Sequence, residues 1–220
     1  MIAKPLALFA VLILGSALSA CSSTSPPGAG DLALQAIRER VSAVDAIYLS
    51  DSVIGALPNQ AYRLDDGRFV AESDEVIVGS IANVEVSTAY KMDGERVTKL
   101  DDPLDETAWW RMLTISITVE RYWGPNPTAE ASWTLPVSNP APVQDTIESL
   151  KSLGTLLLIM KDGRIVHNEE YLGVVTAEGT IEFPVLEDSS AAIGISTVDQ
   201  LWQQLGVTPE VRDADLLGLR

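Results

Sequence analysis

The sequence is poor in cysteine, histidine and cationic residues. Its 220 residues include one cysteine, one histidine, and 15 lysines and arginines against 31 aspartates and glutamates, for a formal charge of -16. A single cysteine excludes an intramolecular disulfide, so packing alone must stabilise the fold. A single histidine excludes any site that needs two imidazoles. The few, unclustered cations argue against binding to nucleic acid or to anionic lipid headgroups.

Common catalytic motifs are also missing. The sequence contains no Gly-x-Ser-x-Gly elbow, no Walker loop and no His-Glu-x-x-His helix. His167 stands beside Glu169 and Glu170, which could supply a histidine and two carboxylates to a metal. This segment follows a hairpin and has no second ligand cluster, so we expect a solvated hairpin there.

A second candidate for metal binding is the densest acidic stretch, in an expected loop between two strands. Its spacing does not match an EF-hand loop, and it lacks the glycine at the turn position. The acidic residues are Asp101, Asp102, Asp105 and Glu106. We therefore predict no catalytic residue, no metal and no cofactor, and calcium binding by this loop stays open.

The long apolar run of the chain lies at its N-terminus. Lys4 precedes the apolar segment Leu6–Leu14, and small residues follow from Gly15 to Ala20. This order is typical of a cleaved signal peptide, and the segment is short for a permanent membrane span. The four residues Leu18, Ser19, Ala20 and Cys21 resemble the lipobox of bacterial lipoproteins.

The lipobox resemblance implies that Cys21 receives a diacylglyceryl group and, after cleavage, becomes the N-terminus. Residues 1–20 are then the signal peptide and residues 21–30 a lipidated cysteine with a flexible tether. Cleavage leaves 200 residues and removes Lys4, which changes the formal charge from -16 to -17. Ser22 resembles the residue found in lipoproteins sent to an outer membrane, but inner and outer membranes remain alternatives. A further alternative is an ordinary secretory signal peptide, with a cysteine that lies beside the cleavage site by chance.

Residues 31–220 form one expected globular domain. Asp31 is predicted to cap a helix that ends before Asp51. Alternating apolar residues predict strands at Val76–Val86, Met112–Glu120 and Ala129–Val137. Gly79 is expected to mark a bulge or a close backbone approach, and Pro136 an edge strand or a strand end.

The second half of the domain mixes helices and hairpins. A helix is expected at Val143–Leu153, followed by a strand buried on both faces at Leu156–Met160. A tight turn at 161–164 predicts that Ile165 and Val166 pair back onto that strand, and a second hairpin is expected around 177–179. Ser196 and Asp199 predict a capping box for a final helix that stops at Gly206.

The order of these elements resembles the OB-type barrel of netrin-like modules and tissue inhibitors of metalloproteinases. Three segments carry the resemblance: Glu75–Ile81, Leu113–Gly124 and Leu153–Leu158. It implies an α+β fold, mostly antiparallel β, with an OB-like barrel core at about residues 70–185 and flanking helices. It implies architecture alone, because this chain lacks the disulfides and the free N-terminal cysteine of the animal inhibitors.

Trp109 and Trp110 precede the clearest strand. Side chains alternate in a strand, so one of the two rings must point away from the core. Exposed aromatic rings are enriched at contact sites. We therefore expect a membrane-anchored, extracytoplasmic envelope lipoprotein, not an enzyme, in which Trp109 and Trp110 contact an envelope protein or cell-wall partner. An unrecognised hydrolase or metal-dependent enzyme and a purely structural envelope component are the alternatives.

Overall fold

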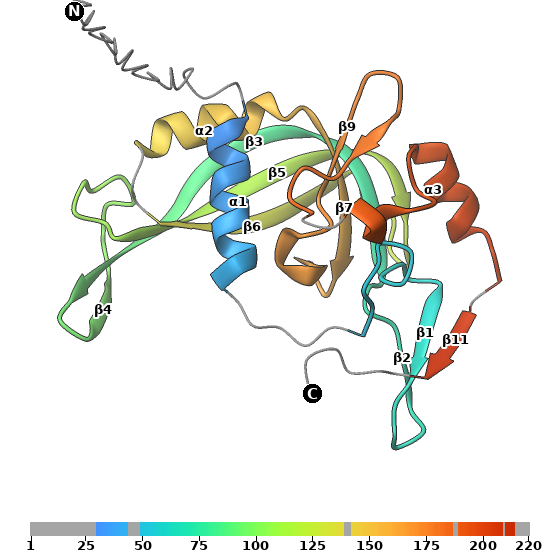
Figure 1. Cartoon of the computed structure of the whole chain (residues 1–220). Coiled ribbons are helices and arrows are strands. Elements are labelled where there is room, and N and C mark those ends of the chain that lie inside the picture. Colours follow the sequence, from blue (N-terminus) through green and yellow to red (C-terminus); the bar gives the residue numbers. More distant parts are fainter. Residues whose placement is uncertain (1–29, 44–48, 139–141, 187–188, 209, 214–220) are drawn as a thin grey trace, which may run out of the picture.

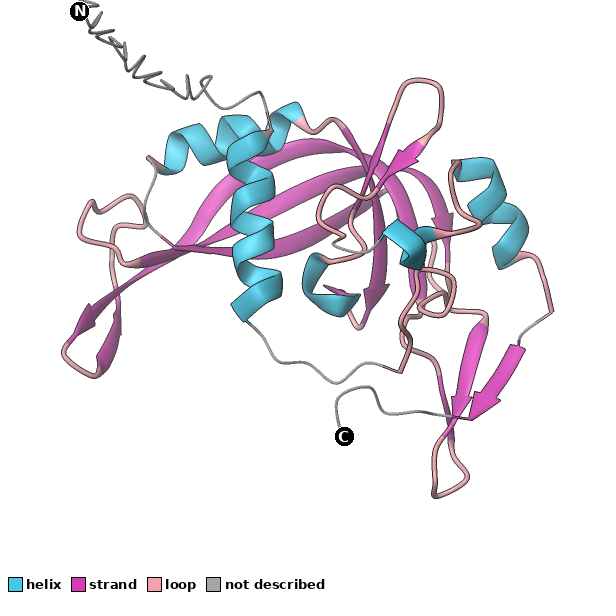
Figure 2. Cartoon of the chain, viewed as in Figure 1, coloured by secondary structure: helices cyan, strands magenta, loops and turns pink. Residues whose placement is uncertain are grey.

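The computed structural model describes residues 30–43, 49–138, 142–186, 189–208 and 210–213. Within these ranges, antiparallel strands dominate and a few helices flank them (Figures 1 and 2). The elements in chain order are α1 (Asp31–Ala43), β1 (Gln60–Arg63), β2 (Phe69–Val70), β3 (Glu75–Asp93), β4 (Arg96–Lys99), β5 (Trp110–Trp123), β6 (Glu130–Ser138), α2 (Val143–Ser152), β7 (Thr155–Lys161), β8 (Arg164–Ile165), the 3-10 helix η1 (Val166–Glu169), β9 (Gly173–Val175), β10 (Ile181–Glu182), the 3-10 helix η2 (Ser189–Ala192), α3 (Val198–Leu205) and β11 (Glu210–Asp213). The predicted α+β class is confirmed at this level.

The main sheet has the strand order β10-β9-β7-β3-β5-β6, with β4 paired to β3 and β8 paired to β7. All of these neighbours are antiparallel. The strands expected from alternation correspond to β3, β5 and β6, and the two expected hairpins correspond to β7–β8 and β9–β10. Pro136 lies within β6, which stands at one end of the strand order. An edge position suits proline because it has no N–H to donate to a ladder.

The longest strand, β3, has 19 residues and curves along its length (Figure 1). Its pairing with β5 shifts register at three places, the first between Val78 and Gly79. A β-carbon at Gly79 would lie 2.4 Å from the carbonyl oxygen of Thr118 and 2.6 Å from Cγ2 of Ile117. Only glycine allows the two backbones to approach this closely, so the prediction of a bulge with close backbone approach is confirmed.

Helices α1 and α2 cover one face of the sheet (Figure 1). Ala33 and Ile37, one helical turn apart, are fully buried on α1, and Leu150 is fully buried on α2. The backbone N–H of Ala33 donates to Oγ of Ser149 over 2.9 Å, which fixes the two helices to each other. The helix predicted at Val143–Leu153 is confirmed, with Gly154 after it at φ 74°.

The opposite face packs against α3 and the turn at residues 53–57. Strand β7 lies between the two cores and alternates between them. Leu156 and Leu158 belong to the core under α1 and α2, whereas Leu157 and Ile159 belong to the core under α3. All four are fully buried, so the prediction of a strand covered on both faces is confirmed.

The sheet does not close into a barrel within the described residues. Its path ends at β6 on one side and at β10 on the other. Helix α1 packs against both β6 and η1. The helix therefore lies beside the β6 end of the sheet, and the observed architecture is an antiparallel sheet with flanking helices.

Strands β1, β2 and β11 form a separate three-stranded sheet that the sequence did not predict. β1 pairs in parallel with β11, which lies some 150 residues further along the chain. Strands of four residues or fewer carry too little alternation to identify. Their pairing depends on contacts that are remote in sequence.

Three predicted positions need correction. Asp31 is the first residue of α1 and not the residue that caps it. Thr197, not Ser196, caps α3, because its hydroxyl accepts the N–H of Gln200 over 3.2 Å. Ser196 and Thr197 are both good capping residues, so sequence could not choose between them. Val166 was expected to pair with β7, but it is the first residue of η1 and makes no such pair.

Candidate functional site

The predicted anchor residues lie outside the described part of the chain. These are Leu18, Ser19, Ala20 and Cys21. Among the described residues, no helix is long and apolar enough to cross a membrane. The predicted partner-binding residues, Trp109 and Trp110, are both described and lie at the base of a protruding arm.

The arm is the hairpin of β3 and β4, residues 90–99, and it carries an uncovered apolar surface. Met92 and Val97 are cross-strand neighbours and are 47% and 49% exposed. Trp110 stacks on Tyr90, its partner in β3, with ring centroids 4.3 Å apart. Trp109, just before β5, is 56% exposed. We call these five residues the aromatic strip.

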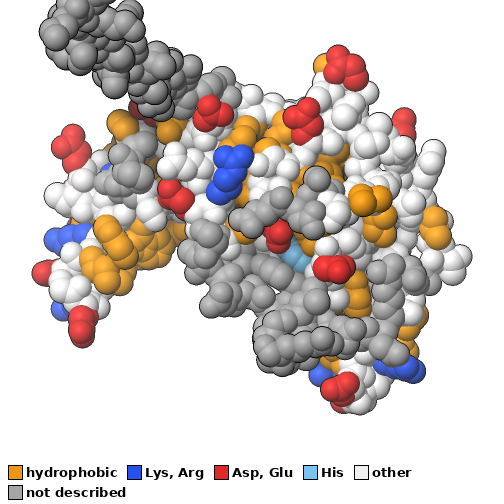
Figure 3. Space-filling model, in the orientation of Figure 1, with side chains coloured by type: hydrophobic (Ala, Val, Ile, Leu, Met, Phe, Trp, Pro, Cys, Tyr) orange, Lys and Arg blue, Asp and Glu red, His pale blue; other side chains and the backbone are white. Residues whose placement is uncertain are grey.

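Figure 3 shows hydrophobic side chains gathered along this arm, where acidic and basic side chains flank them. The expectation that one ring of the tryptophan pair points away from the core fits the exposure of Trp109. The ring of Trp110 is half-buried and held by Tyr90. At the base of the arm, the ring of Trp110 is therefore fixed by stacking, and the neighbouring ring of Trp109 is exposed.

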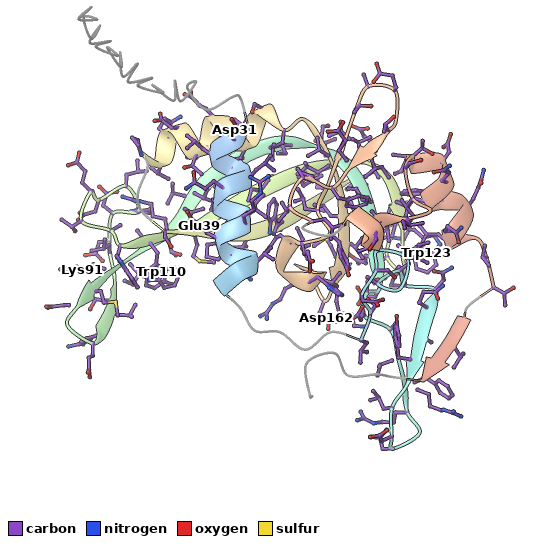
Figure 4. The ribbon with its side chains drawn as sticks, viewed as in Figure 1. Asp31, Glu39, Lys91, Trp110, Trp123 and Asp162 are labelled. Carbon is purple, nitrogen blue, oxygen red and sulfur yellow. The ribbon has the colours of Figure 1, made fainter. Side chains whose placement is uncertain are left out.

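A cavity of about 240 Å³ lies where the strip meets α1 and β6. We call it the aromatic cavity. Glu39 and Trp110, labelled in Figure 4, lie on the same side of α1. The residues that line the aromatic cavity are Ala36, Glu39, Arg40, Trp109, Trp110, Pro136, Val137 and Ser138.

A second cavity, of about 480 Å³, shares Arg40 and Pro136 with the first. It continues along β6 toward the turn at Asp162–Arg164. Arg40 therefore stands at the junction of the two cavities. We call the second one the β8 cavity because β8 lines it.

Arg40 is held in place by a buried acid. Its Nε donates to Oε2 of Glu169 over 2.7 Å, and Nε1 of Trp133 donates to the other carboxylate oxygen over 3.1 Å. Glu169 is 2% exposed, and burial raises the pKa of its carboxyl above the usual value although Arg40 and Trp133 oppose the shift. Its φ of 72° is strained for a residue other than glycine.

The predicted solvated hairpin around His167 is wrong. The side chain of His167 is 2% exposed, stacks on Tyr171 with ring centroids 4.1 Å apart, and contacts Glu72. The contact joins Nε2 of His167 to Oε2 of Glu72 over 3.0 Å. The error arises because Glu72, which accompanies the histidine into the interior, is 95 residues away in the sequence.

The carboxylate of Glu72 also binds the segment at Leu49 and Ser50. It accepts the N–H of Leu49, the N–H of Ser50 over 3.3 Å, and the hydroxyl of Ser50. Burial alone would raise the pKa of Glu72, but hydrogen bonds from His167, Ser50 and Leu49 outweigh it and hold the pKa below its usual value. Glu72 thus fixes residues 49 and 50 to η1.

Ser50, Glu72 and His167 do not have the geometry of a nucleophilic triad. In a triad, one imidazole nitrogen accepts the serine proton and the other donates to the carboxylate. Here Nε2 of His167 lies 3.0 Å from Glu72 and 3.4 Å from Oγ of Ser50, so the same nitrogen faces both. Since an ionised carboxylate can only accept, Nε2 must carry the proton and has no lone pair for Ser50. The cluster is suited to holding the fold together.

The acidic loop at 101–106 lies between β4 and β5, as expected, and wraps around an arginine. Arg111 is 4% exposed and donates to the carbonyl oxygens of Pro103 over 3.2 Å and Asp105 over 2.7 Å. The Asp105 carboxylate accepts the N–H and the hydroxyl of Thr107, which lower its pKa. Several oxygens of the loop are thus used within the loop itself.

Within the described ranges, no three His, Cys, Asp or Glu side chains are arranged to hold a metal ion. The chain matches no model of a known protein family, no curated protein and no solved structure. The site must therefore be interpreted from its own geometry.

The sequence identified the tryptophans but missed the other walls of the aromatic cavity. Glu39 and Arg40 are ordinary surface positions on a helix, and the helix meets β6 about 100 residues later in the chain. Tyr90 gave no signal because its stacking on Trp110 depends on the register of β3 and β5. Pro136 was predicted to mark an edge strand or a strand end, and it lies beside both cavities within the end strand β6.

Proposed function

We propose that this protein is a lipid-anchored lipoprotein of a bacterial envelope, and that its extracytoplasmic domain binds an envelope protein or a cell-wall component. One observation carries the binding role: Trp109 is 56% exposed and lines a cavity to which helix α1 also contributes. Monomeric domains rarely leave several large apolar side chains together in water without a use. The aromatic strip and its cavity are the proposed binding surface.

The lipobox at residues 18–21 supports the anchor. Two acyl chains on one glycerol supply the two signals that stable membrane anchoring needs. A Cys21→Ser variant should leave the membrane fraction, because it cannot receive the diacylglyceryl group. Full retention of the variant in washed membranes would contradict lipid anchoring at this residue.

The strand order supports an OB-like interpretation of the domain. The path β6-β5-β3-β7-β9, with α2 between β6 and β7 in the chain, resembles the five-stranded antiparallel arrangement of OB barrels. OB folds bind ligands across the face of their second and third strands and through the loops that flank it. In this chain those strands are β5 and β6, and both cavities lie along them. This likeness is one of architecture.

The binding role is tested by crosslinking the full-length protein in cells and identifying what it captures. The Trp109→Ala variant removes the exposed ring, and Ile193→Ala is the matched control, since Ile193 is 72% exposed and lines neither cavity. We expect a crosslinked species that Trp109→Ala loses and Ile193→Ala keeps. Identical products from all three proteins would contradict the proposed surface.

A further inference from the structure

We propose that the aromatic cavity binds a ring of an uncharged saccharide chain. This inference rests on the proposed function and names the chemical class of the partner. It follows from three properties of the cavity: the pair of indole rings, the balance of its two charged side chains, and its size.

The indole rings supply a stacking surface. One face of a sugar ring presents C–H groups, which carry slight positive charge and pack on the negative face of an aromatic ring. Trp109 is exposed, and Trp110 is fixed by its stacking on Tyr90. A ring fixed before binding loses little side-chain entropy when a ligand arrives.

The polar groups of the cavity match hydroxyl groups. Arg40 uses Nε–H for Glu169, and the remaining N–H groups of its guanidinium are donors at the junction of the two cavities. Glu39 accepts a hydrogen bond from Gln35 over 3.1 Å, and a carboxylate can accept from several donors at once. A hydroxyl group both donates and accepts, so neighbouring hydroxyls can hydrogen-bond to the acid and to the base.

The charges favour a neutral ligand. The aromatic cavity has one acid and one base among its lining residues, so it carries no net charge. An anionic polymer would also meet the formal charge of -16 on the chain. An uncharged ligand avoids that repulsion and can hydrogen-bond to the acid and the base of the lining at once.

The size of the site indicates a chain bound ring by ring. The aromatic cavity holds about 240 Å³, which is below the range of about 300–1,000 Å³ for sites that enclose a whole drug-sized ligand. The β8 cavity continues from it at Arg40 and Pro136. One ring in the first cavity and the next toward the second would place Arg40 between them.

A polypeptide partner fits the same surface less well. A peptide strand added to the edge of β6 would need the backbone donors of that edge. Pro136, which lines both cavities, has no N–H to offer. The peptide is therefore the competing outcome of the test.

The test is isothermal titration calorimetry on the full-length lipidated protein in nanodiscs. The probes are two neutral hexamers, of glucose and of N-acetylglucosamine, and an acidic hexamer of galacturonate. We expect at least one neutral hexamer to bind, and to bind ten-fold or more tightly than galacturonate. Trp109→Ala and Glu39→Gln should each weaken that binding at least ten-fold, and Ile193→Ala should leave it unchanged.

Two results would overturn the saccharide proposal: no heat with either neutral hexamer, or binding that Trp109→Ala and Glu39→Gln do not change. If the crosslinking experiment still gives a protein product that depends on Trp109, the binding surface stands and its partner is a polypeptide. If crosslinking captures no product of any kind that depends on Trp109, the proposed function fails as well.

Discussion

The two ends of strand β3 differ in how their faces are covered. At residues 75–80, where β3 pairs with β7, α1 and α2 cover one face and α3 with the turn at 53–57 covers the other. At residues 88–93, the acidic loop covers the face that carries Arg111, while the face of Tyr90 and Met92 stays open. Apolar side chains occur at both ends. The extent of the flanking helices and loops therefore determines which apolar residues are buried in the core. It also determines which remain available to a partner.

The largest expected effect is at the covered end. Leu158→Ala removes a fully buried side chain from the core under α1 and α2 and should lower the free energy of unfolding by about 2–5 kcal/mol. Urea denaturation measures the loss. The matched control at the open end is Val97→Ala, at a side chain 49% exposed, with an expected change of about 0.5 kcal/mol or less. Similar losses of unfolding free energy in the two variants would contradict the claim that only one end of β3 is covered on both faces.

Gly79→Ala should also act at the covered end, through crowding. The added methyl group would meet backbone atoms of Thr118, which cannot move without shifting β5. We expect a loss of about 1–3 kcal/mol in the free energy of unfolding. The control is Gly94→Ala in the turn of the arm, where an added β-carbon meets nothing within 4 Å. Gly94 has a φ of 62°, so a smaller loss from backbone strain is expected there.

Glu72→Gln should destabilise the protein in a pH-dependent way. The folded pKa of Glu72 is lower than its unfolded pKa, so its stabilisation is present above the unfolded pKa and is lost as pH falls through the folded pKa. We expect a loss of about 1–3 kcal/mol at pH 7, from hydrogen bonds to a charged group, that shrinks below about pH 4.

Thermal unfolding from pH 3 to pH 8 follows the change, with Glu169→Gln as the comparison. Burial raises the folded pKa of Glu169, so the stability that this carboxyl contributes falls as pH rises. The two variants should therefore show opposite trends with pH. Parallel trends would contradict the different roles of the two acids.

Arg111→Met should loosen the covered face of the arm. It removes the donors to the carbonyl oxygens of Pro103 and Asp105 while keeping an unbranched apolar side chain. We expect a loss of about 1–2 kcal/mol in unfolding free energy and faster amide exchange at Leu104 and Thr107. Hydrogen–deuterium exchange measures the second effect. Unchanged exchange at both amides would show that Arg111 does not hold the loop.

Trp109→Ala should have the smallest effect on folding, because its side chain is 56% exposed. The expected change in unfolding free energy is within about 0.5 kcal/mol. The same variant should lose the binding described above. A loss of several kcal/mol in unfolding free energy would show that Trp109 is packed in the core. It would contradict the view that this end of β3 has an uncovered face.

Local chemistry made much of the fold predictable. The apolar run at 156–160 indicated a strand covered on both faces, and Gly79 and Pro136 marked a bulge and an edge through properties of single residues. The tryptophan pair indicated one exposed ring but not which one, because the start of β5 sets the alternation.

The buried polar contacts could not be predicted in the same way. Arg40 and Glu169 are 129 residues apart, and each alone is typical of a solvated surface. Likewise, the sequence predicted the helix that begins near Asp31, but it did not predict that this helix packs against β6 and η1. These contacts depend on which distant segments pack together, and local sequence patterns do not predict that packing.

Helix α1 also determines how the domain takes up mechanical load. It begins at Asp31, so any pull on the preceding residues enters the domain through this helix. Ala33 and Ile37 are buried along it, and Arg40 is tied to Glu169 near its far end. A force on the preceding residues would therefore act first on the contacts of this helix, before it reached the hydrogen bonds between the strands.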